Sequence, residues 1–557
     1  MDRRTLLFVV ISVGILLGYQ ELVLDRLAPP SPIESSSAPG NPDPGASSLP
    51  GAAIAPGSEA AANQPPAIDD VMVQEQAPVE GRRILVETDL YRATLNTAGG
   101  RLEGIELKGF RQEVAAGSPL LQLVVPAAEV ALPLGVELRG AELWSDAGVS
   151  YAADHDSLTL TNTDTGTLEL RGTSKGVLLV KRFTFRGDAY PIALEIETPG
   201  PEGLPEKLQQ DGPDGSPPAL ALVWTRGPGS TDETILALEG AAALIGGKLE
   251  IQKRSDLETP LTFPGPVEWA GIEDHYFLTA AAPTGANAVQ VRTRGNAIES
   301  RILSPLSATG PTSAEYLLYL GPKDRSTLVA AGHDLLRGLN LGWFGPISLL
   351  LLDLLLFLHR FSGNWGVDII LLTVLVKLLF WPLTRKSFDS MRQMQKIQPE
   401  MAKIRERHKD DSAKMNQEIM ELYKRHKVNP LGGCLPMVLQ IPVFFGLYTL
   451  LANTIELRHA PFGFWIHDLA APERVMILGI GVPVLTLLLG VTMFVQQRMT
   501  PAQGDPTQQR IMMFMPLIFT FMFIGFPAGL TIYWLTNNVL TIAQQWLNLR
   551  SPGKPSS

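Results

Sequence analysis

The sequence has a single cysteine, Cys434, so no intramolecular disulfide can form and no disulfide framework supports any domain. Histidine is scarce too. Between Arg83 and Leu320 the only histidines are His155 and His275, and neither has a ligand partner at metal-binding spacing. Acidic residues predominate before residue 340, which argues against a nucleic-acid partner for that part. We therefore predict no metal site, no cofactor and no direct readout of nucleic acid.

Catalytic groups are missing from the predicted membrane spans of the second half of the chain. These spans contain no Ser/His pair and no paired aspartates, so an intramembrane hydrolase would have no nucleophile and base. They also show no inverted repeat, which argues against a transporter. We predict that the protein is not an enzyme.

Apolar residues are what the chain does have. Over 557 residues the hydrophobic content is 45% and the mean hydropathy is +0.12, values typical of a membrane protein with a large soluble part. The net charge of −10 is unevenly distributed, because the block that follows Leu383 is basic. The predicted fold class is a multidomain α+β protein, with a six-helix polytopic membrane core and an all-β sandwich domain.

The first 80 residues predict an anchor and a tether. Arginines at positions 3 and 4 precede the apolar run from Leu6 to Tyr19, and no A-x-A cleavage site follows. We predict that residues 1–28 form an uncleaved signal anchor, the first transmembrane helix, with a cleaved signal peptide as the alternative. Residues 29–80 are rich in Pro, Ala, Ser and Gly and are predicted to be a disordered linker.

Residues 81–325 predict a β-sandwich domain. Short runs of alternating apolar and polar residues, rich in Val, Thr and aromatics, are separated by Gly, Pro, Asp and Asn. The clearest runs are Ile84–Thr88, Tyr91–Asn96, Leu102–Leu107, Leu158–Asn162, Leu178–Phe185 and Ala193–Glu197. This domain is more plausibly a binding or scaffolding module than an enzyme.

Asn364–Leu383 is long enough to cross a bilayer core of roughly 30 Å as a helix, and it contains Lys377. A lysine within a spanning helix costs on the order of 2.5 to 3.5 kcal/mol, so such residues usually face a bundle interior or a wet cavity. Thr373 lies one turn earlier on the same helical face. We predict that this face lines a polar recess. The alternative is that Lys377 snorkels toward the nearer membrane surface.

A second leucine-rich segment, Gly342–Phe361, precedes this span. Hydropathy alone would favour a span, but the segment carries Asp353, His359 and Arg360. We predict that residues 326–362 form a connector and an amphipathic helix that lies along the outer membrane surface.

The block Thr384–Val428 has twelve Lys and Arg against seven acids. Two apolar stripes at helical spacing flank a polar turn, so residues 384–428 predict a helical hairpin. Pro399 is expected to kink the first helix or to restart it. Four apolar segments complete the chain: Leu435–Leu457, Val475–Val495, Ile511–Phe526 and Leu530–Leu547.

Charge sets the predicted topology. The positive-inside rule places the basic hairpin in the cytoplasm, so residues 363–549 form a core of five spans and residues 550–557 form a cytoplasmic tail. With the signal anchor, the chain has six spans, both termini cytoplasmic and the β domain outside.

Several motifs in this core resemble the YidC/Oxa/Alb family of membrane protein insertases. They occur in family order and spacing from about residue 342 to residue 549, and the layout before them is similar to that of Gram-negative members. In those members a large periplasmic β supersandwich precedes the core, so the resemblance implies that the all-β domain of this multidomain α+β chain is an all-β periplasmic supersandwich. The motifs are Gly363–Gly366, Trp381–Thr384, Lys427–Pro436, Gln440–Pro442, Phe514–Pro516, Phe526–Leu530 and Tyr533.

The resemblance implies a function and a set of partners. Members insert and fold proteins of the bacterial inner membrane, alone or with the Sec translocon and its accessory proteins, and a ribosome contact is a further expectation. The substrates are nascent inner-membrane proteins, and the lipid bilayer is the other partner. The family groove opens to the cytoplasm and carries one basic residue, usually arginine, where this chain has Lys377. Lysine keeps the charge but lacks the planar, bidentate fork of arginine.

The resemblance and the polar residues of the spans together give a predicted site with no catalytic residue. Besides Lys377, the groove is expected to contain the polar residues Thr373, Gln440, Thr531, Tyr533 and Asn538. The expected substrate contacts are Ile441, Phe444, Phe514 and Trp534, for which ordinary helix packing is the alternative. The rival function is an anion transporter or channel that uses Lys377 as its anion site.

Overall fold

The structure is a computed structural model. It describes residues 81–115, 117–124, 131–213, 215–226, 240–257, 259–294, 297–408, 411–426, 435–499 and 506–550. The predicted signal anchor and linker, residues 1–80, lie outside the described residues, and so does the tail from residue 551. Those three assignments therefore stay predictions.

Three antiparallel-rich sheets make up the N-terminal domain, from Arg83 to Pro322, which confirms the predicted large β domain. The five-stranded sheet has the order β4 (Leu120–Val124), β3 (Arg101–Arg111), β2 (Tyr91–Asn96), β1 (Arg83–Glu87) and β8 (Ser157–Thr159). The six-stranded sheet has the order β15 (Leu261–Pro264), β18 (Ala288–Arg294), β19 (Ala297–Pro305), β12 (Ala219–Arg226), β5 (Gly135–Arg139) and β6 (Leu143–Ser145).

The nine-stranded sheet is the largest. Its order is β14 (Lys248–Lys253), β13 (Gly240–Ile245), β16 (Val267–Glu273), β17 (Phe277–Pro283), β20 (Thr312–Pro322), β11 (Ile192–Thr198), β10 (Val177–Arg186), β9 (Thr165–Ser174) and β7 (Ala152–Ala153). β17 is buried along its whole length, which explains why it reads as a continuous apolar run without alternation. The run Leu158–Asn162 is a strand only as far as Thr159, because the Asp164 carboxylate accepts from the Thr161 amide and turns the chain.

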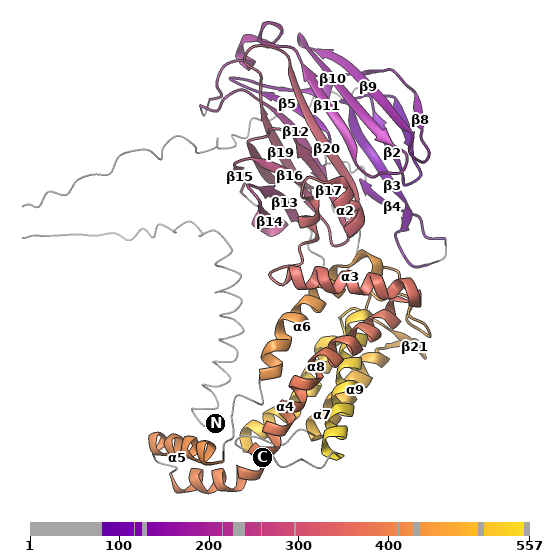
Figure 1. Cartoon of the computed structure of the whole chain (residues 1–557). Coiled ribbons are helices and arrows are strands. Elements are labelled where there is room, and N and C mark those ends of the chain that lie inside the picture. Colours follow the sequence, from indigo (N-terminus) through magenta and orange to yellow (C-terminus); the bar gives the residue numbers. More distant parts are fainter. Residues whose placement is uncertain are drawn as a thin grey trace, which may run out of the picture.

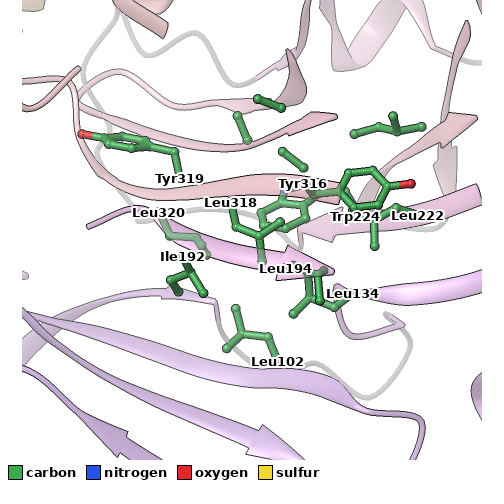
Figure 2. Packing of buried hydrophobic residues seen from close by; sticks show 14 of the residues in the cluster. Leu102, Leu134, Ile192, Leu194, Leu222, Trp224, Tyr316, Leu318, Tyr319 and Leu320 are labelled. Carbon is green, nitrogen blue, oxygen red and sulfur yellow. The ribbon is translucent and has the colours of Figure 1, made fainter. Parts of the chain in front are cut away.

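One hydrophobic core joins the three sheets. Figure 2 shows Leu102 of the five-stranded sheet, Leu194 and Leu318 of the nine-stranded sheet, and Trp224 of the six-stranded sheet converging in it. A buried amine fastens the same junction: Lys181 on β10 pairs with Asp146 at 2.7 Å and donates to the carbonyls of Gly99, Gly100 and Leu134. The β domain is therefore a rigid body rather than three separate sheets.

The C-terminal part is helical. Its elements are α2 (Arg325–Ala331), the 3-10 turn η6 (Leu335–Leu339), α3 (Gly345–Ser362), α4 (Trp365–Arg407), α5 (Ser412–Arg425), α6 (Leu435–Asn453), the 3-10 turn η8 (Ile455–Leu457), the hairpin of β21 (Val475–Ile477) and β22 (Ile480–Val482), α7 (Val484–Met499), α8 (Pro506–Phe523) and α9 (Ala528–Arg550). In Figure 1, α3 lies across the end of the bundle that faces the β domain, whereas α4, α7, α8 and α9 run lengthwise. By length and composition, two of the described helices could span a membrane: α3 and the first 21 residues of α4.

Two corrections apply to these helices. Of the two alternatives at Pro399, the restart is excluded, because α4 continues through Pro382 and Pro399 as one element. The kink stays a prediction. α4 then packs on α5 through a seam in which Ile397, Met401 and Leu422 are buried.

The second correction concerns the apolar segment Val475–Val495, which is not one helix. Its first eight residues form the β21–β22 hairpin, because Leu478 and Gly479 both have positive φ, and α7 begins only after Pro483. At 16 residues, α7 is about 24 Å long by helical rise, shorter than a bilayer core.

The two parts of the chain meet at an extensive contact. Ile455 and Ala470, from the loop between α6 and α7, lie in the core of the β domain. Arg458 from the same loop donates to the Gln112 carbonyl at 3.2 Å, and its guanidinium lies 5.7 Å from the centre of the Phe277 ring. His275 is buried, and its Nε2 hydrogen-bonds to the Ala452 carbonyl.

The Glu456 carboxyl at this contact makes it sensitive to pH. Burial, with repulsion from Asp324, raises the pKa of Glu456 from 4.5 to about 7. The docked state therefore keeps a proton that the undocked state releases near pH 4.5. The contact should be most stable below that pH, weaken as pH rises from 4.5 to 7, and change no further above 7.

We expect hydrogen exchange at residues 455–457 of the full chain in detergent, after correction for intrinsic rates, to speed up by roughly 50- to 100-fold from pH 5 to pH 8. The decisive variant is Glu456→Gln, in which the pH dependence should disappear. Glu202→Gln, an exposed site in the β domain, should keep it. A pH dependence that persists in Glu456→Gln would assign the effect to another group.

Candidate functional site

A hydrogen-bonded corner between α3 and α4 sets the direction in which α4 leaves the surface. The Asp368 carboxylate is fully buried and binds His359 Nδ1 at 2.7 Å and the Ser362 hydroxyl. Gly363 ends α3 at φ 63°, and Asn364 caps α4 by accepting from the Val367 amide at 3.1 Å. In the stretch Gly363–Gly366, the residue that ends α3 is therefore followed directly by the residue that caps the start of α4.

Lys377 lies on the part of α4 that packs against α9. It is half-buried, and its Nζ donates to the Thr541 hydroxyl at 2.9 Å. Thr541 in turn donates to the Asn537 carbonyl at 2.7 Å, and Gln440 of α6 donates to the Asn537 side chain at 3.5 Å. Residues from three helices therefore form one polar cluster, which we call the amine cluster: Lys377, Gln440, Asn537 and Thr541.

Among the described residues, the charge in this cluster has no counter-charge. Within the described part of the chain, no carboxylate lies within ion-pair distance of the Lys377 amine, whose acceptor is a neutral hydroxyl. Further along α9, three buried polar atoms have no hydrogen-bond partner among the described residues: Asn538 Nδ2, Gln544 Oε1 and Gln545 Oε1. Buried polar groups are normally satisfied by protein or by ordered water. Water or a polar group of another molecule could satisfy these three atoms.

The other predicted polar residues lie outside the amine cluster. The Thr373 hydroxyl is buried and donates to the Ile369 carbonyl of its own helix at 2.6 Å. The Thr531 hydroxyl does the same toward Pro527, at the opposite end of α9 from Thr541. Tyr533 is packed in the hydrophobic core of the bundle.

The predicted contact residues divide into two groups. Phe444 of α6 packs edge-on against Trp534 of α9 at 4.9 Å, and Phe523 of α8 packs on the same indole at 4.4 Å. Ile441 and Phe514 are instead exposed, by 41% and 60%. An aromatic brace thus ties α6, α8 and α9 together, while the exposed pair faces outward from the bundle.

Sequence reasoning missed Thr541 and Asn537. Thr541 lies one turn beyond Asn537 and three residues beyond Asn538, so helical spacing would have placed it on the predicted polar face. That it accepts from Lys377 depends on how α9 packs on α4, and no local pattern encodes that packing.

The loop between α6 and α7 holds the far ends of the helices in place. The Ala471 and Leu469 carbonyls accept from the first amides of α9, Ala528 at 2.9 Å and Gly529 at 2.8 Å. Glu473 is buried and accepts from the Leu485 amide at the start of α7 at 2.7 Å. The axial position of α9, and so the height of Thr541 beside Lys377, is fixed from this end.

Metal chemistry has no support in this site: within the described part of the chain, no group of three His, Cys, Asp or Glu could hold a metal ion. The arrangement can hydrogen-bond, attract an anion and accept water. Nothing in it resembles a nucleophile beside a base.

Comparison with known proteins defines the class. Residues 357–554 match the family model described as 60Kd inner membrane protein, and residues 83–354 match that of the YidC periplasmic domain. The β domain and the helical bundle together are therefore those of a membrane protein insertase with a periplasmic domain.

Individual relatives match most or nearly all of the chain. The chain is similar to the membrane protein insertase YidC of Nitratidesulfovibrio vulgaris strain Miyazaki F, 41% identical over 494 residues, which are 85% of this chain and 87% of the relative. It is 37% identical to that of Maridesulfovibrio salexigens over 563 residues, 99% of each chain. Among solved structures, an active YidC insertase covers 84% of this chain and 92% of its own, at 18% identity and a TM-score of 0.35.

The chain belongs to the YidC family of membrane protein insertases. Membership confirms the predicted family, the non-enzymatic class and a place in the inner membrane with the β domain as the periplasmic part.

The bond between Lys377 and Thr541 can be tested with a double-mutant cycle. The free energy of unfolding is measured in mixed micelles for the wild type, Lys377→Met, Thr541→Val and the double variant. We expect a coupling free energy of about 1 kcal/mol, in the range found for hydrogen bonds between membrane helices. Thr373→Val is the matched control, because the Thr373 hydroxyl donates to a carbonyl of its own helix. Its change in the free energy of unfolding should simply add to that of Lys377→Met. Additivity in both cycles would mean that the amine does not rely on Thr541.

Proposed function

We propose that this chain inserts and folds nascent inner-membrane proteins through a recess that is open to the cytoplasm and centred on the amine cluster. The observation that carries the proposal is an amine with a neutral acceptor, beside buried polar atoms that have no partner, inside a bundle of apolar helices. Such a group is costly in the membrane and usually marks a functional path.

The physical problem in insertion is the polar flank of the substrate. Leu, Ile, Phe and Val each contribute about −0.3 to −0.6 kcal/mol at the membrane centre, so burial of the new helix is favourable. The flank that crosses has no hydrogen-bond partners in hydrocarbon. A wet recess that extends partway through the bundle shortens this crossing.

The amine of Lys377 adds attraction for acidic flanks. At 4 Å and an effective dielectric constant of 20, two opposite unit charges attract by about 4 kcal/mol. Since the resident partner of Lys377 is the hydroxyl of Thr541, an incoming carboxylate displaces no counter-ion. The amine can also release the carboxylate readily, because a single ammonium lacks the bidentate grip of arginine.

The apolar surface for the substrate helix lies outside the aromatic brace. Ile441 on α6 is exposed, and α8 exposes Met513 (50%), Phe514 (60%) and Met515 (38%). Flexible methionines can adapt to helices of different shape. Phe444 and Trp534 hold this surface in position from behind. Of the predicted polar residues outside the amine cluster, Asn538 adds an amide nitrogen without a partner among the described residues to the proposed lining, whereas Thr373, Thr531 and Tyr533 support the helices that form it.

The proposed topology has six spans with both termini in the cytoplasm. Residues 1–28 are the first span, residues 363–549 hold the other five with the hairpin 384–428, and residues 326–362 form the connector. The crossing direction of α3 in Figure 1 supports a place on the outer surface, and the α4–α5 hairpin stands at the end of the bundle opposite the β domain. The twelve cations of residues 384–428 favour the cytoplasm. Residues 29–80 and 550–557 are the proposed linker and tail.

Partners follow from this arrangement. Nascent inner-membrane proteins and the bilayer act at the recess, and the Sec translocon with its accessory proteins would approach from the side or from the periplasm. The basic hairpin offers a surface to a ribosome.

Replacement of the host insertase by Lys377 variants tests this function. In depleted cells that express Lys377→Arg, insertion of a substrate with an acidic flank should be normal, whereas Lys377→Glu should slow it about tenfold by repelling the flank. Lys403→Glu changes the same charge on the exposed hairpin and should have no effect. Normal insertion in cells without any copy of the chain would refute the function. Normal insertion by Lys377→Glu would refute the role of the charge alone.

The wet recess can be tested independently of activity. In a Cys434→Ser background, we expect a thiol at Asn537→Cys to react with a membrane-impermeant maleimide supplied on the cytoplasmic side. Val539→Cys, two residues away on the 48% exposed outer side of α9, should stay unlabelled in membranes. If position 539 reacts and position 537 does not, the bundle has no recess at the amine cluster.

A further inference from the structure

An apolar β-hairpin projects from the loop between α6 and α7. β21 and β22 pair in the register Val475 to Val482 and Ile477 to Ile480. All eight residues from Val475 to Val482 are apolar or glycine, and none is buried. Leu478 is 99% exposed, and Met476 and Ile480 are each 69% exposed. Two strands with apolar side chains on both faces have no core of their own to bury them.

The turn of this hairpin has leucine where a polar residue is usual. Leu478 and Gly479 have φ of 52° and 82°, the two-residue turn in which both central residues are left-handed. Asn, Asp or Gly usually fills the first position, because an L side chain is strained there unless it hydrogen-bonds locally. Leucine offers no such bond. The leucine side chain at position 478 therefore gains no stabilisation within the turn, and any stabilisation has to come from whatever the exposed tip contacts.

The surroundings of the hairpin are apolar as well. It stands at the same end of the bundle as α3, which exposes Phe361 by 77%, and Phe464 in the same loop is 90% exposed. α7 starts two residues after the hairpin and exposes Leu487, Leu488 and Val491 by 48%, 47% and 60%. The hairpin thus continues the outward apolar side of α7 toward the level of α3.

We propose that Val475–Val482 is a membrane anchor whose tip, Leu478, inserts into the acyl chains of the outer leaflet. The occupant of this surface is lipid. The two outer edges of a hairpin leave amides and carbonyls without partners, so the tip can enter only as far as the boundary between headgroups and acyl chains. Arg474, exposed at the base, is placed for phosphate headgroups.

The anchor would hold the outer end of α7, which is too short to span the bilayer core by itself. It would also steady the loop that caps α7 and α9. The inference rests on the proposed direction of the spans but not on the insertase activity.

Depth-dependent quenching tests the anchor. The full chain, with Cys434→Ser and Leu478→Cys, is labelled with an environment-sensitive fluorophore and reconstituted in phosphatidylethanolamine–phosphatidylglycerol vesicles that contain nitroxide lipids. We expect blue-shifted emission and stronger quenching by nitroxides near the headgroups than by nitroxides near the bilayer centre. The substitution should not affect folding, because Leu478 is 99% exposed.

Two control positions separate the outcomes. Leu178→Cys, 47% exposed on β10, should keep water-like emission, and Val491→Cys on α7 should be quenched most by the deep nitroxides. If the fluorophore at position 478 shows water-like emission while the one at position 491 is quenched by deep nitroxides, the anchor proposal is wrong but the proposed arrangement of the spans is retained. Water-like emission at both positions overturns the span arrangement and the anchor with it. A blue shift that grows with protein density, without nitroxide quenching, indicates a second copy on the hairpin and also overturns the proposal.

Discussion

An amine held inside a bundle of apolar helices is the constraint on which the helical part of this protein depends. Lys377 cannot leave its position on α4 without moving a spanning helix, and it cannot stay without an acceptor. The hydroxyl of Thr541 meets that need at 2.9 Å. This single bond requires α9 to lie beside α4 at one height, and the rest of the bundle is arranged so that it does.

The position of α9 is set from its opposite end. The loop between α6 and α7 accepts hydrogen bonds from the first amides of α9 and caps α7 through Glu473, and the same loop enters the core of the β domain. The three-sheet domain, in which Lys181 pairs with Asp146 at the junction of the sheets, thus supports the ends of α7 and α9 through this loop. A large soluble domain and a small polar cluster are connected through one loop.

The sequence predicted the elements better than their ends. Strand β2, Tyr91–Asn96, matches its predicted run because strict alternation places one face in the core. The segment Val475–Val495 failed because hydropathy counts apolar residues but not backbone conformation, and Leu478, Gly479 and Pro483 turn the chain. At Pro399 a restart was one of two alternatives, and it is excluded because α4 continues as one helix, which packs on α5 beyond the proline. Thr541 was missed because its role requires a partner 164 residues away.

By itself, the sequence determined the two-part organisation, the basic hairpin, the family and the single lysine within an apolar span, because composition, periodicity and motif spacing are local properties. The tertiary structure decided which polar groups meet that lysine, which of the predicted polar residues serve only their own helix, and where an apolar run becomes a hairpin. These depend on the relative height and rotation of helices that are distant in the chain. Packing and hydrogen bonding between elements fix both, and neither is encoded in any one segment.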